Sequence, residues 1–274
     1  MSNALHSLLS QLTDPIVRDL AWALASPNLL QHSPQAPDNL WYSQLLTEYQ
    51  PRLLELDDNP ALLHLHCQPH RRLGFYFESL WHFFLLDHDR YQLLAHDWQQ
   101  VIDGTTVGAF DFIVWDQRLK RIEHWELAVK FYLISQQDNP FDSAFGMNPR
   151  DKLRRKHQHM LNHQLMLSQQ PHVHQHLKRL GLLPQHKRLI LKGRLYYPVH
   201  CQQFLSEHGE RGIWGLESPK PGFIPQHKLG WLTGGRHSER LDRKQNFSDA
   251  KGNWYIQVDK EWLDDTSEIE QQES

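Results

Sequence analysis

The stretch His124-Trp125-Glu126-Leu127-Ala128-Val129-Lys130-Phe131-Tyr132-Leu133 contains the strongest pattern in the chain. In a β-strand, successive side chains point to opposite faces. The odd-numbered residues would form a wholly apolar face, whereas Glu126 and Lys130 would share the other face. Charges in a core strand are unfavourable unless they are paired or hold a metal. We interpret this stretch as a buried strand that carries a functional site.

A second acidic residue stands just upstream. Residues 106–115 are rich in β-branched and aromatic side chains, which predicts a strand with Asp111 between Phe110 and Phe112. The short polar segment 116–121 suits a hairpin loop. Two adjacent antiparallel strands would place Asp111 beside Glu126, which suggests a divalent-cation site.

A third acidic residue precedes both strands. Residues 73–86 are apolar nearly all round, which predicts a buried helix. Glu78 lies inside this segment and would need a cation or hydrogen-bond donors to remain charged.

The order is a helix with Glu78, a strand with Asp111, and a strand with Glu126 and Lys130. This order resembles the PD-(D/E)XK, or restriction-endonuclease-like, nuclease superfamily over about residues 73–197. The chain is also similar to a bacterial family of unknown function that is grouped with these nucleases by fold. The resemblance implies a mixed α/β (α+β) fold: a restriction-endonuclease-like core with a central mixed sheet flanked by helices.

The resemblance also implies the chemistry. Asp111, Glu126 and Glu78 would bind Mg²⁺ or Mn²⁺, either directly or, for Glu78, through water. A lysine would orient the attacking water and stabilise the charge that develops on phosphorus. The superfamily spacing places this lysine at position 128, which is Ala128 here. Lys130 lies on the same face, roughly 6–7 Å further along the strand, and is the predicted catalytic lysine. In the superfamily the lysine also occurs on other elements, and the basic helix described next is one alternative.

A basic helix is predicted after the acidic strands. Asn148 and Pro149 form a helix-start signal, and the helix is expected to run to residue 169. Lys152, Arg155 and Lys156 share one face and are the predicted nucleic-acid contacts. The alternative is an ordinary amphipathic helix with a solvated basic face.

Structural roles are the alternative for the acidic residues. Asp111 could cap a bulge, Glu126 could form an ion pair with Lys130, and Glu78 could pair with Arg71 or Arg72. The fold would then be a catalytically inactive module that binds nucleic acid or a protein partner.

Four regions are expected along the chain. Residues 1–70 form a helical N-terminal extension, with helices after Asp14 and at 41–50, the second stopped or kinked at Pro51. Residues 71–199 form the nuclease-like core, with further strands at 91–96 and 188–197. Residues 200–263 are an irregular elaboration rich in Trp, Gly and Pro, whose tryptophans are expected to be core rather than base-stacking platforms. Residues 264–274 are an acidic tail that is expected to be disordered.

Composition narrows the class of protein. The net charge is −3 with neutral histidines, so a nucleic-acid enzyme would need a local basic surface. Two cysteines provide no disulfide framework. No apolar stretch is long enough to span a bilayer, and residues 1–25 lack a signal-peptide pattern, so we expect a cytoplasmic protein without membrane association.

The predicted function is a metal-dependent phosphodiesterase acting on DNA, or else on RNA.

Overall fold

A computed structural model describes residues 3–30, 32–67, 72–136, 138–199, 201, 210–239 and 244–273. The helices are α1 (Asn3–Gln11), α2 (Pro15–Ala25), α3 (Asn39–Asp58), α4 (Ala61–His66), α5 (Leu73–Asp87), α6 (Leu153–His159), α7 (Pro171–Leu180) and α8 (Lys260–Glu273). Short helical turns are the π-helix η1 (Met160–Gln164) and the 3₁₀ helices η2 (Leu167–Gln169) and η3 (Lys228–Trp231). The strands are β1 (Tyr91–Ile102), β2 (Thr105–Asp116), β3 (Arg121–Ile134), β4 (Ala144–Phe145), β5 (His186–Pro198), β6 (Arg211–Gly215), β7 (Ile224–Pro225), β8 (Gln245–Ser248) and β9 (Trp254–Gln257).

One mixed sheet organises the described part of the chain. Its strands follow the order β1-β2-β3-β5-β6-β9-β8-β7, and β4 pairs with β3. The pairs β1/β2 and β2/β3 are antiparallel, whereas β3/β5, β5/β6 and β6/β9 are parallel. The predicted mixed α/β fold with helices flanking a large sheet is therefore confirmed. The predicted order of helix, three strands, helix and strand corresponds to α5, β1 to β3, α6 and β5.

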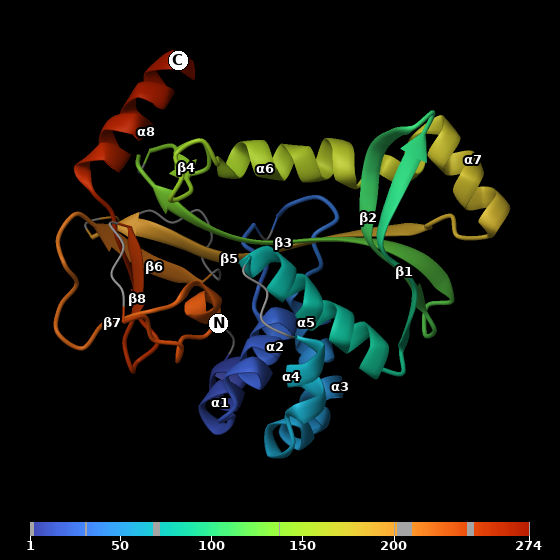
Figure 1. The fold of residues 1–274 in the computed structure, drawn as a ribbon, viewed down its shortest axis with the longest axis horizontal. Helices are drawn as coiled ribbons and strands as arrows, with labels where there is room; N and C mark the ends of the chain where they lie inside the picture. The colour runs from blue at the N-terminus through green and yellow to red at the C-terminus, as the bar shows by residue number, and fades with distance from the viewer. Residues whose placement is uncertain are drawn as a thin grey trace.

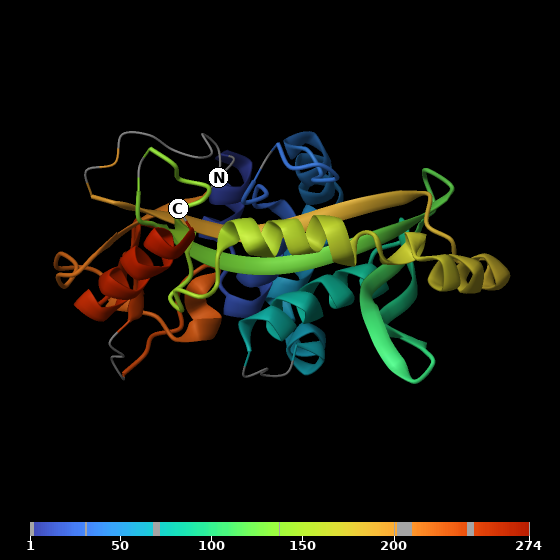
Figure 2. The same ribbon diagram turned by 90° about the horizontal axis from the view of Figure 1, so that it is seen from above.

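Helices cover both faces of the sheet (Figures 1 and 2). The N-terminal helices and α5 pack on the face of β3 that carries Trp125 and Leu133, and they form the main core with it. α6 and η1 pack on the opposite face, where Met160 belongs to a second cluster together with Leu189 and Leu191. The two faces of β3 are therefore buried against different helices. The alternating side chains predicted for this strand belong to two separate hydrophobic layers.

The hairpin of β1 and β2 extends away from the main body, between α6 and α7 (Figure 1). Asp103 and Gly104 form its two-residue loop, with φ of 49° and 76°, as a tight hairpin turn requires. β1 is longer than the predicted strand at 91–96. Its second half packs through Trp98 and Ile102 against a third cluster that includes Val173 and Leu177 of α7.

The basic helix starts later than predicted. Asn148 begins a turn in which its carbonyl accepts from the Asp151 N–H at 2.9 Å. Lys152 then forms a bridge with Phe145, which keeps the chain extended, so the helix begins at Leu153. The predicted start was wrong because this local pairing with the sheet competes with the helix-start signal. The helical path does continue through η1 and η2 to Gln169, as predicted.

Two other boundaries differ from the predictions. α3 runs through Pro51 to Asp58 instead of stopping there. β6, β8 and β9 extend the central sheet beyond residue 199, so the region after this boundary completes the sheet. Trp214 and Trp254 are buried in the main core, as expected for core tryptophans.

The acidic tail is not disordered where the structure describes it. Residues 260–273 form α8, in which Trp262 is fully buried and donates from Nε1 to the Gly146 carbonyl at 2.9 Å. Glu270 accepts hydrogen bonds from Ser135 and Gln136, both at 2.6 Å. The prediction failed because acidic composition was given more weight than these tertiary contacts. Within the described ranges, no helix has the length and apolar character needed to cross a membrane.

Candidate active site

Asp111 and Glu126 lie side by side where β2 and β3 separate. The regular pairing of the two strands ends at Phe112 and Trp125. Beyond that pair, Oδ2 of Asp111 accepts a hydrogen bond from the Leu127 N–H at 2.8 Å. The two carboxyl groups are close enough for the charge of Glu126 to raise the pKa of Asp111.

Glu126 is fully buried and has two further polar partners. His124 Nε2 lies 2.6 Å from Oε1 of Glu126, and Gln164 donates from Nε2 to Oε2 at 2.6 Å. His124 is also fully buried, and its Nδ1 has no hydrogen-bond partner among the residues that the structure describes. Burial lowers the pKa of His124 to about 3, so its imidazole is neutral at physiological pH.

Burial dominates the electrostatics of the two carboxyl groups. It raises the pKa of Glu126 to about 8. Burial, followed by repulsion from Glu126, also holds the pKa of Asp111 well above its usual value. The two acids therefore titrate as a coupled pair that retains a proton near neutral pH. A bound cation would compensate the same negative charge.

Lys156 is the lysine whose positive charge acts on Glu126, where it opposes the rise in pKa. It donates from Nζ to Oε1 of Gln164 at 3.1 Å, so the amide of Gln164 bridges Lys156 and Glu126. Burial lowers the pKa of Lys156, as does the charge of Lys130, whereas Asp111 and Glu126 oppose this shift. Lys156 belongs to α6, the helix that was predicted to be basic. The prediction placed this lysine on the exposed face of the helix as a phosphate contact.

Gln164 was not identified from the sequence. It is the last residue of the π-helix η1, a type of helix that is rare and frequent at functional sites. Its neighbours Leu161, Asn162 and His163 provide no pattern that distinguishes it from an ordinary surface glutamine. Only the packing of η1 against β2 and β3 brings its amide to Glu126.

Lys130 does not reach the acid pair. Its Nζ donates to Oδ2 of Asp151 at 2.6 Å, and Tyr132 donates to the other oxygen of Asp151 at 3.1 Å. The predicted approach of Lys130 to the metal acids is therefore not observed, and neither is the alternative ion pair with Glu126. The reason is the register of β3, which carries the lysine away from Glu126 toward the turn that precedes α6.

Glu78 lies at the edge of the site. It is near enough to raise the pKa of Asp111, as a smaller contribution than burial, but its Oε1 faces His96 Nε2 at 2.8 Å. In the part of the chain that the structure describes, no group of three or more His, Cys, Asp or Glu side chains is placed to hold a metal ion. Glu78, Asp111 and Glu126 therefore do not form a direct three-ligand set. Of the alternatives for Glu78, Arg72 lies over the Phe75 ring, and Arg71 lies outside the described residues.

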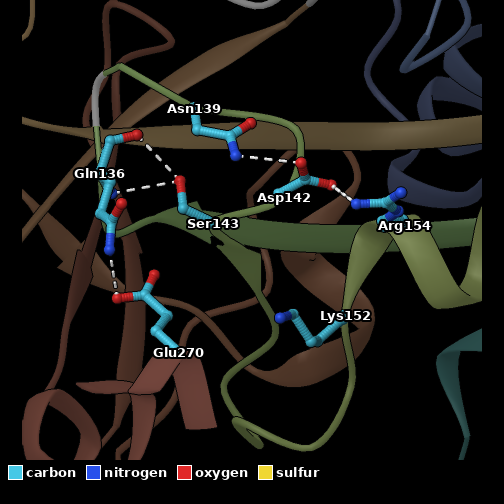
Figure 3. A pocket seen from close by; sticks show the side chains of 7 residues that line it. All are labelled: Gln136, Asn139, Asp142, Ser143, Lys152, Arg154 and Glu270. Carbon is cyan, nitrogen blue, oxygen red and sulfur yellow. Dashed lines mark hydrogen bonds and ion pairs between the residues drawn. The ribbon is translucent and has the colours of Figure 1, made fainter. Parts of the chain in front are cut away.

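The predicted nucleic-acid contacts have different environments. Arg155 is exposed, Lys156 is partly buried at the acid pair, and Lys152 is buried. The ammonium of Lys152 lies 4.7 Å from the centre of the Phe145 ring. Lys152 also lines a polar pocket of about 200 Å³ together with Arg154, Asp142 and Glu270 (Figure 3). Lys152 therefore lies away from the exposed face of α6, contrary to the prediction.

Comparison with known proteins identifies the family. A protein-family model described as "Domain of unknown function (DUF1853)" matches residues 18–273. The chain belongs to this family. The DUF1853 match covers most of α2 and every later element to α8, and thus the whole candidate site. A search of curated proteins and a search of solved structures each found no match.

The acid pair of this DUF1853 chain predicts how stability depends on pH without metal. The folded-state pKa of Glu126, about 8, lies above its ordinary value of 4.5. The Glu126 carboxyl therefore contributes stability that is fully present below pH 4.5 and is lost as the pH rises through about 8. We expect Glu126→Gln to flatten this part of the wild-type profile, measured by thermal unfolding in EDTA between pH 4.5 and 9. The matched control is Glu268→Gln at an exposed position on α8, which should retain the wild-type slope. Equal slopes for Glu126→Gln and wild type would contradict the raised pKa.

Proposed function

We propose that this chain is a metal-dependent phosphodiesterase that hydrolyses DNA, or else RNA, on a restriction-endonuclease-like core. The observation that supports this most strongly is a pair of neighbouring carboxyl groups on adjacent antiparallel strands, both with raised pKa values and linked through Gln164 to a partly buried lysine. Structural acids in a core are usually neutralised by a cationic side chain. Here Glu126 instead contacts a neutral imidazole and a neutral amide, and it lies beside a second acid.

The donor atoms of the pair fit a hard divalent cation. Mg²⁺ and Mn²⁺ prefer oxygen ligands, and Mg²⁺ commonly binds through one or two carboxylates plus water and substrate phosphate. Asp111 and Glu126 would hold the ion, and Glu78 would contribute through water because its side chain faces His96. When bound, such an ion activates water and neutralises charge on the phosphate.

The surrounding residues have separate roles in this proposal. Lys156 is the cation that stabilises negative charge on the phosphoryl oxygens, in the role first predicted for Lys130. Gln164 positions Lys156 relative to Glu126, because its amide contacts both side chains. His124 orients the Glu126 carboxyl from the buried side of the pair.

The charge distribution supports a polyanionic substrate. Residues 148–187 contain eight Lys or Arg and seven His but only one acidic residue, whereas the whole chain has a net charge of −3. This segment includes α6, η1, η2 and α7, and it directly adjoins the acid pair through Lys156 and Gln164. Local positive charge of this kind is the usual basis for binding phosphate backbones.

Calorimetric titration with Mn²⁺ tests the metal site directly. We expect stoichiometric binding to the wild-type chain near pH 8, accompanied by proton release, because the proton that the raised pKa values retain on the acid pair must leave. Glu126→Gln should remove both the binding and the proton release, and Glu268→Gln should remove neither. Absence of Mn²⁺ binding to the folded wild-type chain would refute the proposed metal site.

A non-catalytic binding module is the second candidate. It is favoured by the fact that both oxygens of Glu126 already have partners in His124 and Gln164. This candidate predicts nucleic-acid binding that is unaffected by Mn²⁺, with no cleavage. A cleavage assay with and without Mn²⁺ on the same DNA distinguishes the two candidates.

A further inference from the structure

We infer that this chain cuts within nucleic-acid strands and does not require a strand end. The inference rests on the proposed function and concerns its mode of action. It is based on the position of the acid pair between two exposed groups of cationic side chains.

The first group, the α6 flank, consists of Arg150, Arg154 and Arg155. All three are exposed and lie at the turn before α6 or in its first part. Arg154 forms a partly exposed ion pair with Asp142 at 2.7 Å, which solvent weakens. Arg155 donates to the Arg150 carbonyl at 3.4 Å, which holds these two residues close together.

The second group, the α7 flank, consists of Lys178 and Arg179 in the last turn of α7. Both are exposed, as are His172 and His176 on the same helix. α7 is held against the β1–β2 hairpin by the cluster around Phe110 and Leu177. The α7 flank therefore has a fixed position relative to Asp111, which belongs to the same hairpin.

The acid pair lies between these flanks. η1 and η2 connect α6 to α7, and both contact β2, the strand that carries Asp111. Gln164, at the end of η1, binds Glu126. Both ribbon views show α6 on one side of the hairpin and α7 on the other (Figures 1 and 2).

The dimensions suit a strand that continues in both directions. α6 and η1 together contain 12 residues and α7 contains 10, which correspond to about 18 Å and about 15 Å of helix. At about 3.4 Å per nucleotide along one strand, each flank can contact several phosphates. Phosphate contacts fix the register of the substrate. Contacts on both sides of the acids hold an internal phosphodiester there, whereas an enzyme that acts on strand ends needs contacts on one side only.

Covalently closed circular DNA provides the decisive substrate. The full-length chain is incubated with Mn²⁺ and with circular or linear DNA of the same sequence, in single-stranded and double-stranded forms. We expect circular DNA to be cleaved at a rate similar to that of linear DNA whose ends are blocked. Asp111→Asn is included to exclude contaminating nuclease.

Paired variants test the two flanks separately. Arg154→Ala/Arg155→Ala and Lys178→Ala/Arg179→Ala each remove two cations from one flank. Each should weaken DNA binding and reduce the salt dependence of log K by about 1.4 for single strands or about 1.8 for duplex. The control is Lys220→Ala/Lys251→Ala, which removes two exposed cations from the C-terminal region. Circular dichroism checks that each variant is folded.

The outcomes separate this inference from the proposed function. Cleavage of circles, with an effect of both flanks on binding, supports the inference. Cleavage restricted to linear DNA with free ends, or an effect of one flank only, overturns it and leaves the phosphodiesterase proposal intact. No Mn²⁺-dependent cleavage of any substrate overturns both.

Discussion

Asp111→Asn is expected to reduce Mn²⁺-dependent cleavage by at least about 10³-fold, equivalent to a loss of about 4 kcal/mol in transition-state stabilisation. The substitution removes one of the two carboxylates that would hold the ion. It retains an oxygen that can accept from the Leu127 N–H, and the amide has nearly the same size as the carboxyl group. The hydrogen bond that supports the local fold is therefore preserved. The measurement is the initial rate of cleavage of a defined DNA at saturating Mn²⁺.

The matched control for this variant is Asp103→Asn. Asp103 is an exposed residue in the loop of the same hairpin, where Asn tolerates its positive φ. It should leave the cleavage rate unchanged. Asp111→Asn should also be at least as stable as wild type in EDTA above pH 8, because it removes a buried repulsive charge. A folded Asp111→Asn variant that cleaves at the wild-type rate would exclude Asp111 from the chemistry.

Lys156→Ala is expected to reduce the cleavage rate by about 10²- to 10³-fold, the usual effect of removing one electrostatic contact to the transition state. Mn²⁺ binding should be largely retained, because the lysine is not a metal ligand. Lys130→Ala should have a much smaller effect, because Lys130 pairs with Asp151 and is separate from the acid pair. Single-turnover rates and calorimetric Mn²⁺ titrations of both variants test these expectations.

The comparison between the two lysines is decisive in either direction. A large loss in Lys130→Ala together with a small loss in Lys156→Ala would return the catalytic role to β3. Equal small losses would mean that neither amine acts on the phosphate. Lys251→Ala serves as the control for removal of an exposed lysine elsewhere.

Local patterns predicted the elements that carry the acids. The alternation in β3 and the apolar run of α5 are strong because both are buried on the faces that their patterns require. The adjacency of Asp111 and Glu126 followed from a short polar loop between two strands, since a hairpin fixes which residues face each other. The order of the acidic tail and the start of the basic helix were predicted less well. The tail is held by the contact of Trp262 with Gly146, and the helix start is delayed by the bridge between Phe145 and Lys152. Composition does not reveal such contacts between different elements.

Within the site, the sequence and the tertiary structure favour different lysines. The spacing along β3 favoured Lys130, because the sequence gives the distance between residues on one strand. The amine of Lys156 comes from a different element, and its approach depends on how α6 and η1 pack over the sheet. Gln164 depends on the same packing and on the π-helical turn that ends at it.

The sequence by itself determined the two-sided burial of β3, the hairpin that pairs Asp111 with Glu126, and the concentration of positive charge after residue 148. These features follow from short-range periodicity and composition, which act within a strand, a turn or a helix. Only the tertiary structure decided which amine adjoins the acids, that Glu78 faces His96, and that the acid pair lies between two cationic flanks. Such features depend on the relative placement of β2, β3, α6 and α7, which long-range packing fixes and no local pattern specifies.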